Sequence, residues 1–160
     1  MKAAFPGSFD PPTMGHLNII ERSALLFDEI TVVVAENRLK KYLFSVEERL
    51  ELVSGLVKPW KNVSVVLCAG IIVDFLKENR IPVLIRGVRG GDFPYEFELS
   101  MMNKGLNPEI ETVFLPTDPA YLVIRSSAIK ELASFGGNVS SMVPPPVEAA
   151  LKAKFARNGD

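Results

Sequence analysis

The sequence predicts an α/β fold in which five parallel strands form an open, doubly wound sheet with helices on both faces. Two observations carry this prediction. Segments typical of strands and helices alternate along the 160 residues, and the strand segments are apolar along nearly their whole length. Strands of that kind are buried on both faces of a parallel sheet. Five strands are too few for an eight-stranded barrel.

The strand segments are short runs rich in β-branched residues. The clearest is Ile-Thr-Val-Val-Val-Ala at residues 30–35, a composition that favours strands. The five expected strands cover residues 3–5, 30–35, 63–67, 83–85 and 113–115.

Helices are expected between and after these strands. Thr13 is a predicted N-cap before an apolar stripe at helical spacing. Ser45 and Glu48 have the spacing of a capping box. Pro94 stands early in its helix, where no N–H is needed. The expected helices cover residues 14–27, 46–57, 71–79, 92–104, 126–135 and 147–156.

Composition indicates one globular domain over residues 1–160. Hydrophobic residues make up 48% and charged residues 23%, as in soluble proteins. The net charge of −1 gives no global field for nucleic acid or an anionic membrane, so neither is an expected partner. Cys68 is the only cysteine and His16 the only histidine, so neither an internal disulfide nor a zinc cluster is expected. A reducing, cytoplasmic location fits this cysteine usage. We find no secretory signal and no run of about 18 apolar residues.

Polar and cationic residues follow four of the predicted strands. They are His16 in a Gly- and Pro-rich turn, Lys40, the pair Arg86 and Arg89, and the pair Ser126 and Ser127 at a helix start. Because carboxyl ends of parallel strands meet at one edge of a sheet, these residues should share a cleft. Arginine forks and helix N-termini bind phosphate groups. The sequence therefore predicts a ligand with two or more phosphates.

Each of these residues also has an interpretation without a function. A lone histidine is more often structural than catalytic. Lys40 and Lys41 are typical of a solvated loop, and Ser126 and Ser127 could serve only as N-caps. Arg86 is the hardest to explain in this way, because it directly follows a buried strand.

Residues 7–16, Gly-Ser-Phe-Asp-Pro-Pro-Thr-Met-Gly-His, resemble the Gly-(Thr/Ser)-Phe-Asp-Pro-x-Thr-x-Gly-His signature of the nucleotidyltransferase superfamily. Lys40, Arg86-Gly87-Val88-Arg89, Tyr95-Glu96 and Ser126-Ser127 narrow the resemblance to the bacterial phosphopantetheine adenylyltransferase family. The resemblance runs from Lys2 to about Phe155 and implies a Rossmann-like form of the predicted fold.

The resemblance implies that the adenylyl group of ATP is transferred to 4′-phosphopantetheine, giving dephospho-coenzyme A and pyrophosphate. The acceptor phosphate would attack the α-phosphorus in line. Catalytic roles are implied for Ser8, His16, Lys40 and Arg89. ATP contacts are implied for Ser8, Phe9, His16, Gly87, Val88, Arg89, Glu96, Tyr121, Leu122, Val123, Ile124, Arg125, Ser126 and Ser127. Contacts with 4′-phosphopantetheine are implied for Ser8, Lys40, Ile72 and Arg86.

Several partners are expected on the same basis. Mg²⁺ should arrive with ATP, because the sequence offers no dedicated carboxylate cage, and no residue is expected to be a metal ligand. Relatives form hexamers, so a homohexamer is expected, and coenzyme A is a candidate feedback ligand. Arg125 and Tyr121 depart from the Ser and Trp that are common in the family. Arg125 either points into solvent or adds a charged donor for the pyrophosphate.

Two other functions stay open. One is a nucleotidyltransferase with another phosphorylated acceptor, such as nicotinamide mononucleotide or a sugar phosphate. The other is a non-catalytic nucleotide-binding module, for which the fold alone would suffice. A flavodoxin-like electron carrier is disfavoured, because an FMN site does not call for two arginines and two lysines around one cleft.

Overall fold

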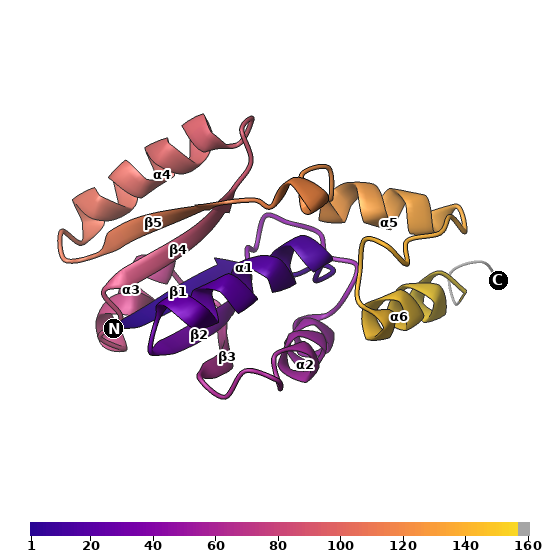
Figure 1. The fold of residues 1–160 in the computed structure, drawn as a ribbon, viewed down its shortest axis with the longest axis horizontal. Coiled ribbons are helices and arrows are strands. Elements are labelled where there is room, and N and C mark those ends of the chain that lie inside the picture. The colour runs from indigo at the N-terminus through magenta and orange to yellow at the C-terminus, as the bar shows by residue number, and fades with distance from the viewer. Residues whose placement is uncertain (157–160) are drawn as a thin grey trace.

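The computed structural model, which describes residues 1–156, contains a five-stranded parallel sheet (Figure 1). The strands are β1 (Lys2–Gly7), β2 (Glu29–Ala35), β3 (Val63–Cys68), β4 (Val83–Val88) and β5 (Glu111–Pro116). Their order in the sheet is β3-β2-β1-β4-β5, and every neighbouring pair is parallel. The chain therefore winds outward on one side of β1 and then returns to wind outward on the other. This confirms the predicted doubly wound sheet and places a crevice where β1 and β4 diverge.

The helices agree with the expected ranges to within a few residues. They are α1 (Met14–Leu26), α2 (Val46–Leu56), α3 (Ile72–Glu78), α4 (Phe93–Leu106), α5 (Ser126–Ser134) and α6 (Pro145–Ala156), with a short 3₁₀ helix η1 (Pro119–Tyr121). The 3₁₀ helix was not predicted. Thr13 and Ser45 both form capping boxes, through His16 and Glu48 respectively. No helix within residues 1–156 has the length and apolar composition needed to cross a bilayer.

One predicted boundary is wrong in a way that matters for the site. Strand β4 does not end at residue 85 but continues to Val88, so Arg86 lies inside the strand and pairs in register with Phe114 of β5. A charged residue is tolerated there because this end of the strand borders a cavity. The prediction of a single domain extends to residue 160 and includes four residues outside the described ones.

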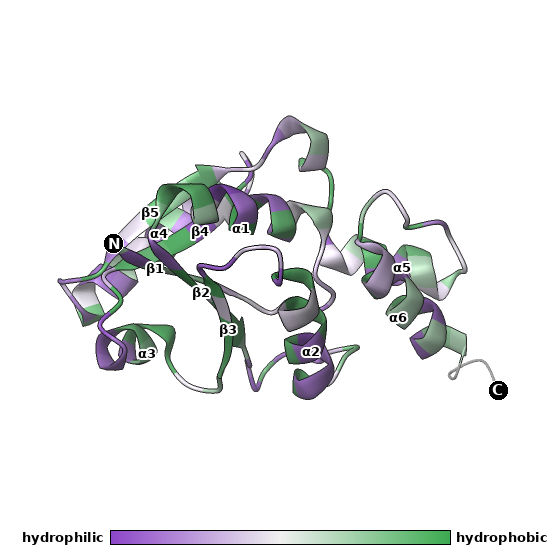
Figure 2. Cartoon of the chain, turned by 60° about the horizontal axis from the view of Figure 1, so that its bottom comes forward, coloured by the Kyte–Doolittle hydropathy of each residue, from purple (hydrophilic) through white to green (hydrophobic). Residues whose placement is uncertain are grey.

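The core has two layers because successive strand residues face opposite sides of the sheet. On one side, Phe5 and Val32 pack with residues of α1 and α2, such as Ile20 and Val53. On the other side, Val33 packs with α3. Figure 2 shows that the helices carry both hydrophilic and hydrophobic residues, as helices with one buried face do.

A third cluster lies beyond the carboxyl ends of the strands. Phe44, two residues before α2, packs with Ile129 of α5 and with Val147 and Leu151 of α6. Figure 1 shows α5 and α6 together at the end of the molecule far from the N-terminus. Of these two helices, α5 borders the cavity at this sheet edge, through Ser126 and Ser127.

Candidate active site

A cavity of about 840 Å³ opens at the carboxyl edge of the sheet. Its wall combines the turn after β1, the loop after β2, the end of β4 and the segment after β5. The structure brings twelve of the predicted site residues into this wall: Ser8, His16, Lys40, Ile72, Arg86, Gly87, Arg89, Tyr121, Ile124, Arg125, Ser126 and Ser127. Segments up to about 120 residues apart in the chain therefore share one cleft, as parallel strands require.

Five predicted ATP contacts lie outside the wall of this cavity: Phe9, Val88, Glu96, Leu122 and Val123. Phe9 and Val88 are buried in the core, whereas Leu122 and Val123 are exposed next to the cleft. Phe9 has a positive φ of 49° and packs its ring against Phe5. A Cβ at Gly7, the last residue of β1, would lie 3.0 Å from the Phe9 ring, so any larger residue there would have to displace that buried ring.

His16 is held by the N-terminus of its own helix. The backbone N–H of Thr13 donates to His16 Nδ1 at 3.0 Å, and the backbone N–H of His16 donates to Thr13 Oγ1 at 3.3 Å. Because Nδ1 accepts a hydrogen bond, the neutral ring carries its proton on Nε2. His16 thus offers the cleft a hydrogen-bond donor of fixed orientation.

The electrostatic surroundings keep this imidazole neutral. Burial, followed by the charges of Arg89 and Arg86, lowers the pKa of His16 from 6.5 to about 4. All three causes disfavour the cationic form of the imidazole. At neutral pH the ring therefore donates from Nε2–H without bringing a further positive charge.

Arg86 is fixed by a carboxylate from α4. Glu96 accepts from Arg86 Nε and Nη2, both at 2.7 Å, and Arg86 Nη1 donates to the carbonyl of Pro6 at 3.3 Å. Glu96 is buried and uses both oxygens in this pair. The structure therefore places Glu96 behind Arg86, where it sets the orientation of the guanidinium.

A second carboxylate, Asp92, bridges two arginines. It accepts from Arg89 Nε at 2.6 Å and lies 3.6 Å from Arg125 Nη1, while Arg89 Nη1 donates to the carbonyl of Ile124 at 2.9 Å. The sequence indicated only that Asp92 starts α4, and its side chain makes no capping hydrogen bond there. Arg125 is 52% exposed and also lines the cavity, together with Arg89.

The start of α5 forms another part of the wall. Arg125 is the N-cap of this helix, and Ser126 Oγ donates to the carbonyl of Pro11 at 3.0 Å. The interpretation of Ser126 as a side-chain N-cap is therefore wrong. The first N–H groups of α5 remain available to an anion in the cleft.

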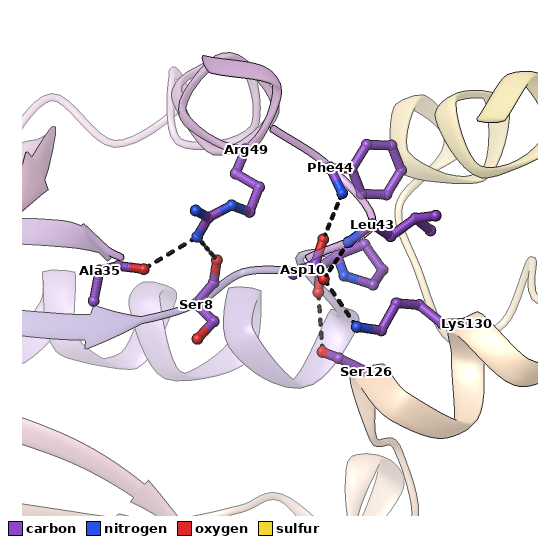
Figure 3. A network of polar contacts seen from close by, with 9 residues as sticks. Ser8, Asp10, Ala35, Leu43, Phe44, Arg49, Ser126 and Lys130 are labelled. Atoms are coloured by element: carbon purple, nitrogen blue, oxygen red, sulfur yellow. Dashed lines mark hydrogen bonds and ion pairs between the residues drawn. The ribbon is translucent and has the colours of Figure 1, made fainter. Parts of the chain in front are cut away.

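Two residues that were not predicted as site residues, Asp10 and Arg49, connect the segments that form the cavity wall (Figure 3). Asp10 accepts from the backbone N–H groups of Phe44 and Leu43, both at 2.9 Å, and from Lys130 Nζ at 2.8 Å. Arg49 Nη1 donates to the carbonyls of Ser8 at 2.7 Å and Ala35 at 3.1 Å. Asp10 belongs to the signature turn and could have been singled out. Nothing in the sequence distinguishes Arg49 from an ordinary surface arginine of a helix.

The pKa of His16 can be measured without interference, because it is the only histidine. In the ligand-free protein the imidazole NMR signals should stay those of the neutral ring, with the proton on Nε2, from pH 8 to below pH 6. The midpoint of the imidazole titration should lie near pH 4.

The same shift makes the stability of the fold depend on pH. The unfolded chain takes up the second imidazole proton near pH 6.5 and the folded chain near pH 4. The contribution of His16 to stability is therefore complete above pH 6.5 and falls as the pH drops towards 4. A midpoint at 6.5 would contradict the account.

Comparisons with known proteins identify the family of this chain. The sequence model of the cytidylyltransferase-like family matches residues 4–132. The phosphopantetheine adenylyltransferase of Dictyoglomus thermophilum is 47% identical over 156 residues, which are 97% of this chain and 95% of that protein. The phosphopantetheine adenylyltransferase of Clostridium tetani is 49% identical over 146 residues, 91% of each chain.

A solved structure supports the fold alone. A putative nicotinate-nucleotide adenylyltransferase from Vibrio parahaemolyticus superposes with a TM-score of 0.69 at 18% identity, covering 99% of this chain and 93% of that one. The sequence matches go further than the fold, because they extend over nearly the whole chain. The chain therefore belongs to the cytidylyltransferase-like family and, within it, to the phosphopantetheine adenylyltransferases.

Proposed function

We propose that this protein transfers the adenylyl group of ATP to 4′-phosphopantetheine, giving dephospho-coenzyme A and pyrophosphate. The observation that carries the proposal is the composition of the cavity wall. Lys40, Arg86, Arg89 and Arg125 supply four cations to one cavity wall, and His16 belongs to the same wall. Such a wall suits two phosphorylated substrates whose phosphates must approach each other. The names of the relatives point to the same pair of substrates.

The acceptor phosphate can attack the α-phosphorus of ATP without a general base, because it is already ionised at neutral pH. The negative charge of the acceptor phosphate is, however, repelled by the ATP phosphates. Lys40 and Arg86 offset that repulsion and hold the nucleophile, and Ile72 lines the same cavity for the apolar part of the pantetheine arm. Catalysis of this kind consists mainly of positioning.

As the bond to pyrophosphate breaks, negative charge grows on the α-phosphate and on the leaving group. His16 Nε2–H and Arg89 are the donors that we assign to this charge, with Arg125 and the first turn of α5 near the pyrophosphate. Donors that are already oriented need no rearrangement during the reaction. With a neutral ring, His16 would stabilise this charge as a hydrogen-bond donor and transfer no proton.

Mg²⁺ enters this proposal as part of the MgATP substrate. Within residues 1–156, no three His, Cys, Asp or Glu side chains gather closely enough to hold a metal ion. The oxygens of the triphosphate would supply the ligands that Mg²⁺ prefers. The chain's own contribution is then to hold the phosphates that carry the ion. Pyrophosphate release from ATP in the presence of 4′-phosphopantetheine, measured with and without Mg²⁺, tests this assignment. Equal release without the ion would contradict it.

The homohexamer remains a proposal, supported by exposed apolar side chains on α4. Met102 and Leu106 are 67% and 68% exposed, and Phe97 and Met101 are also exposed. Several exposed apolar side chains on one helix are typical of an interface. Sedimentation should give six times the mass of one chain, and Met102→Glu should reduce that mass. A wild-type protein that sediments as a monomer would contradict the proposal.

A cytoplasmic location likewise stays a prediction, which fractionation of cells would test.

The acceptor is best identified by pyrophosphate release from ATP. We expect release with 4′-phosphopantetheine and none above background with unphosphorylated pantetheine, because pantetheine lacks the nucleophilic phosphate that Lys40 and Arg86 are proposed to hold. Nicotinamide mononucleotide and a sugar phosphate test the alternative acceptors, and a reaction without acceptor tests simple ATP hydrolysis. Adding coenzyme A to the productive reaction tests the proposed feedback.

Three results of this assay would change the assignment. Faster turnover of nicotinamide mononucleotide than of 4′-phosphopantetheine would favour the alternative acceptor. ATP binding without any turnover would favour a non-catalytic nucleotide-binding module. Turnover of pantetheine at a comparable rate would overturn the role given to the acceptor phosphate.

A further inference from the structure

The loop between β2 and α2 carries Lys40, and few contacts fix its position. Residues 36–41 are exposed, and Lys40 itself is exposed where it lines the cavity. A lysine side chain on such a loop loses much conformational freedom when it binds a phosphate. Contacts that hold the loop in its binding position would therefore strengthen binding.

One such contact is a stack of Arg49 on Tyr42. Arg49 is 1% exposed, and the centre of its guanidinium lies 4.0 Å from the centroid of the Tyr42 ring. Its Nη1 is occupied by the carbonyls of Ser8 and Ala35, and its Nε has no hydrogen-bond partner among the described residues. A cation that is so poorly hydrated gains more than usual from the face of an aromatic ring.

The hydroxyl of Tyr42 continues this chain of contacts to the lysine. It accepts from the backbone N–H of Asn37 at 2.8 Å. Asn37 in turn organises the turn that follows, because its Oδ1 accepts from Leu39 N at 2.9 Å and its carbonyl accepts from Lys40 N at 3.0 Å. Arg49, Tyr42, Asn37 and Lys40 are thus linked in series.

We propose that Tyr42 is a positioning residue, which holds the Lys40 loop against Arg49 and thereby places the lysine for the acceptor phosphate. Arg49 also binds the carbonyl of Ser8. The same guanidinium therefore contacts both the turn after β1, at Ser8, and, through Tyr42, the loop after β2 that carries Lys40. The inference rests on the proposed function, since it takes 4′-phosphopantetheine as the acceptor that Lys40 binds.

The test is a double-mutant cycle between Tyr42 and Lys40, with the Kd of 4′-phosphopantetheine measured by calorimetry and KM and kcat measured by pyrophosphate release. Tyr42→Phe keeps the ring and removes the hydroxyl. It should raise the Kd and KM of the acceptor about 2- to 10-fold, the size of one net hydrogen bond. Tyr42→Leu also removes the ring face and should add a further factor of about 2 to 5. The Kd of ATP should stay within about twofold in both variants, because Lys40 is assigned to the acceptor.

The decisive comparison is made in the Lys40→Ala protein. That substitution alone should weaken acceptor binding about 10- to 150-fold, as loss of a charged hydrogen bond does. If Tyr42 acts through Lys40, neither Tyr42 variant should weaken the Lys40→Ala protein by more than about twofold. Lys41→Ala is the matched control: Lys41 is exposed and is absent from the described cavity wall, so it should bind both substrates like wild type.

The outcomes separate this inference from the proposed function. If the wild-type protein neither binds nor adenylylates 4′-phosphopantetheine, the proposed function fails, and the role of Tyr42 fails with it. If Lys40→Ala weakens the acceptor but Tyr42→Phe does not, only the inference is overturned. Equal effects of Tyr42→Phe on ATP and acceptor, or full additivity with Lys40→Ala, would also overturn it by showing a general structural role. Should Tyr42→Leu fail to fold, the Tyr42→Phe cycle decides alone.

Discussion

The buried carboxylate of Asp10 is the interaction on which the architecture of the cleft depends. It is 4% exposed and joins three segments: the turn after β1, the residues before α2, and α5 through Lys130 (Figure 3). A buried charge with a missing partner costs several kcal/mol, about 3 to 5 when one member of a pair is removed. Here two amides and one ammonium group satisfy it. The contact therefore keeps the start of α5 and the end of the Lys40 loop at the edge where His16 lies.

A second constraint is the mutual repulsion of the cations gathered in the cleft, in a chain whose net charge is only −1. Two of the cleft arginines are each paired with a carboxylate, Arg86 with Glu96 and Arg89 with Asp92, which offsets this repulsion. These pairs orient the guanidinium groups in advance of any ligand, and donors oriented in advance are what electrostatic catalysis needs. Burial first, and then the charges of Arg89 and Arg86, lower the pKa of His16 and keep its imidazole neutral.

The fold could be predicted from the sequence because the periodicity of apolar residues and the helix caps are local signals. The predicted strands 30–35 and 63–67 agree almost to the residue with β2 and β3. The gathering of Lys40, Arg89 and the start of α5 at one edge also followed, since it needs only the direction of parallel strands. The contacts of Asp92, Glu96 and Arg49 could not be predicted. Each depends on how a helix packs on a strand or loop, and such packing leaves no periodic mark in a single sequence.

The central claim is that the cleft aligns two phosphates for direct displacement, with no enzyme-bound adenylyl group. The stereochemistry at the α-phosphorus tests this most directly. The protein is given ATP with sulfur in place of one α-phosphate oxygen in a single configuration, and the configuration of the dephospho-coenzyme A analogue is determined. One in-line attack by the acceptor predicts inversion. Retention would require two displacements, with a covalent intermediate on the protein, and would contradict the account.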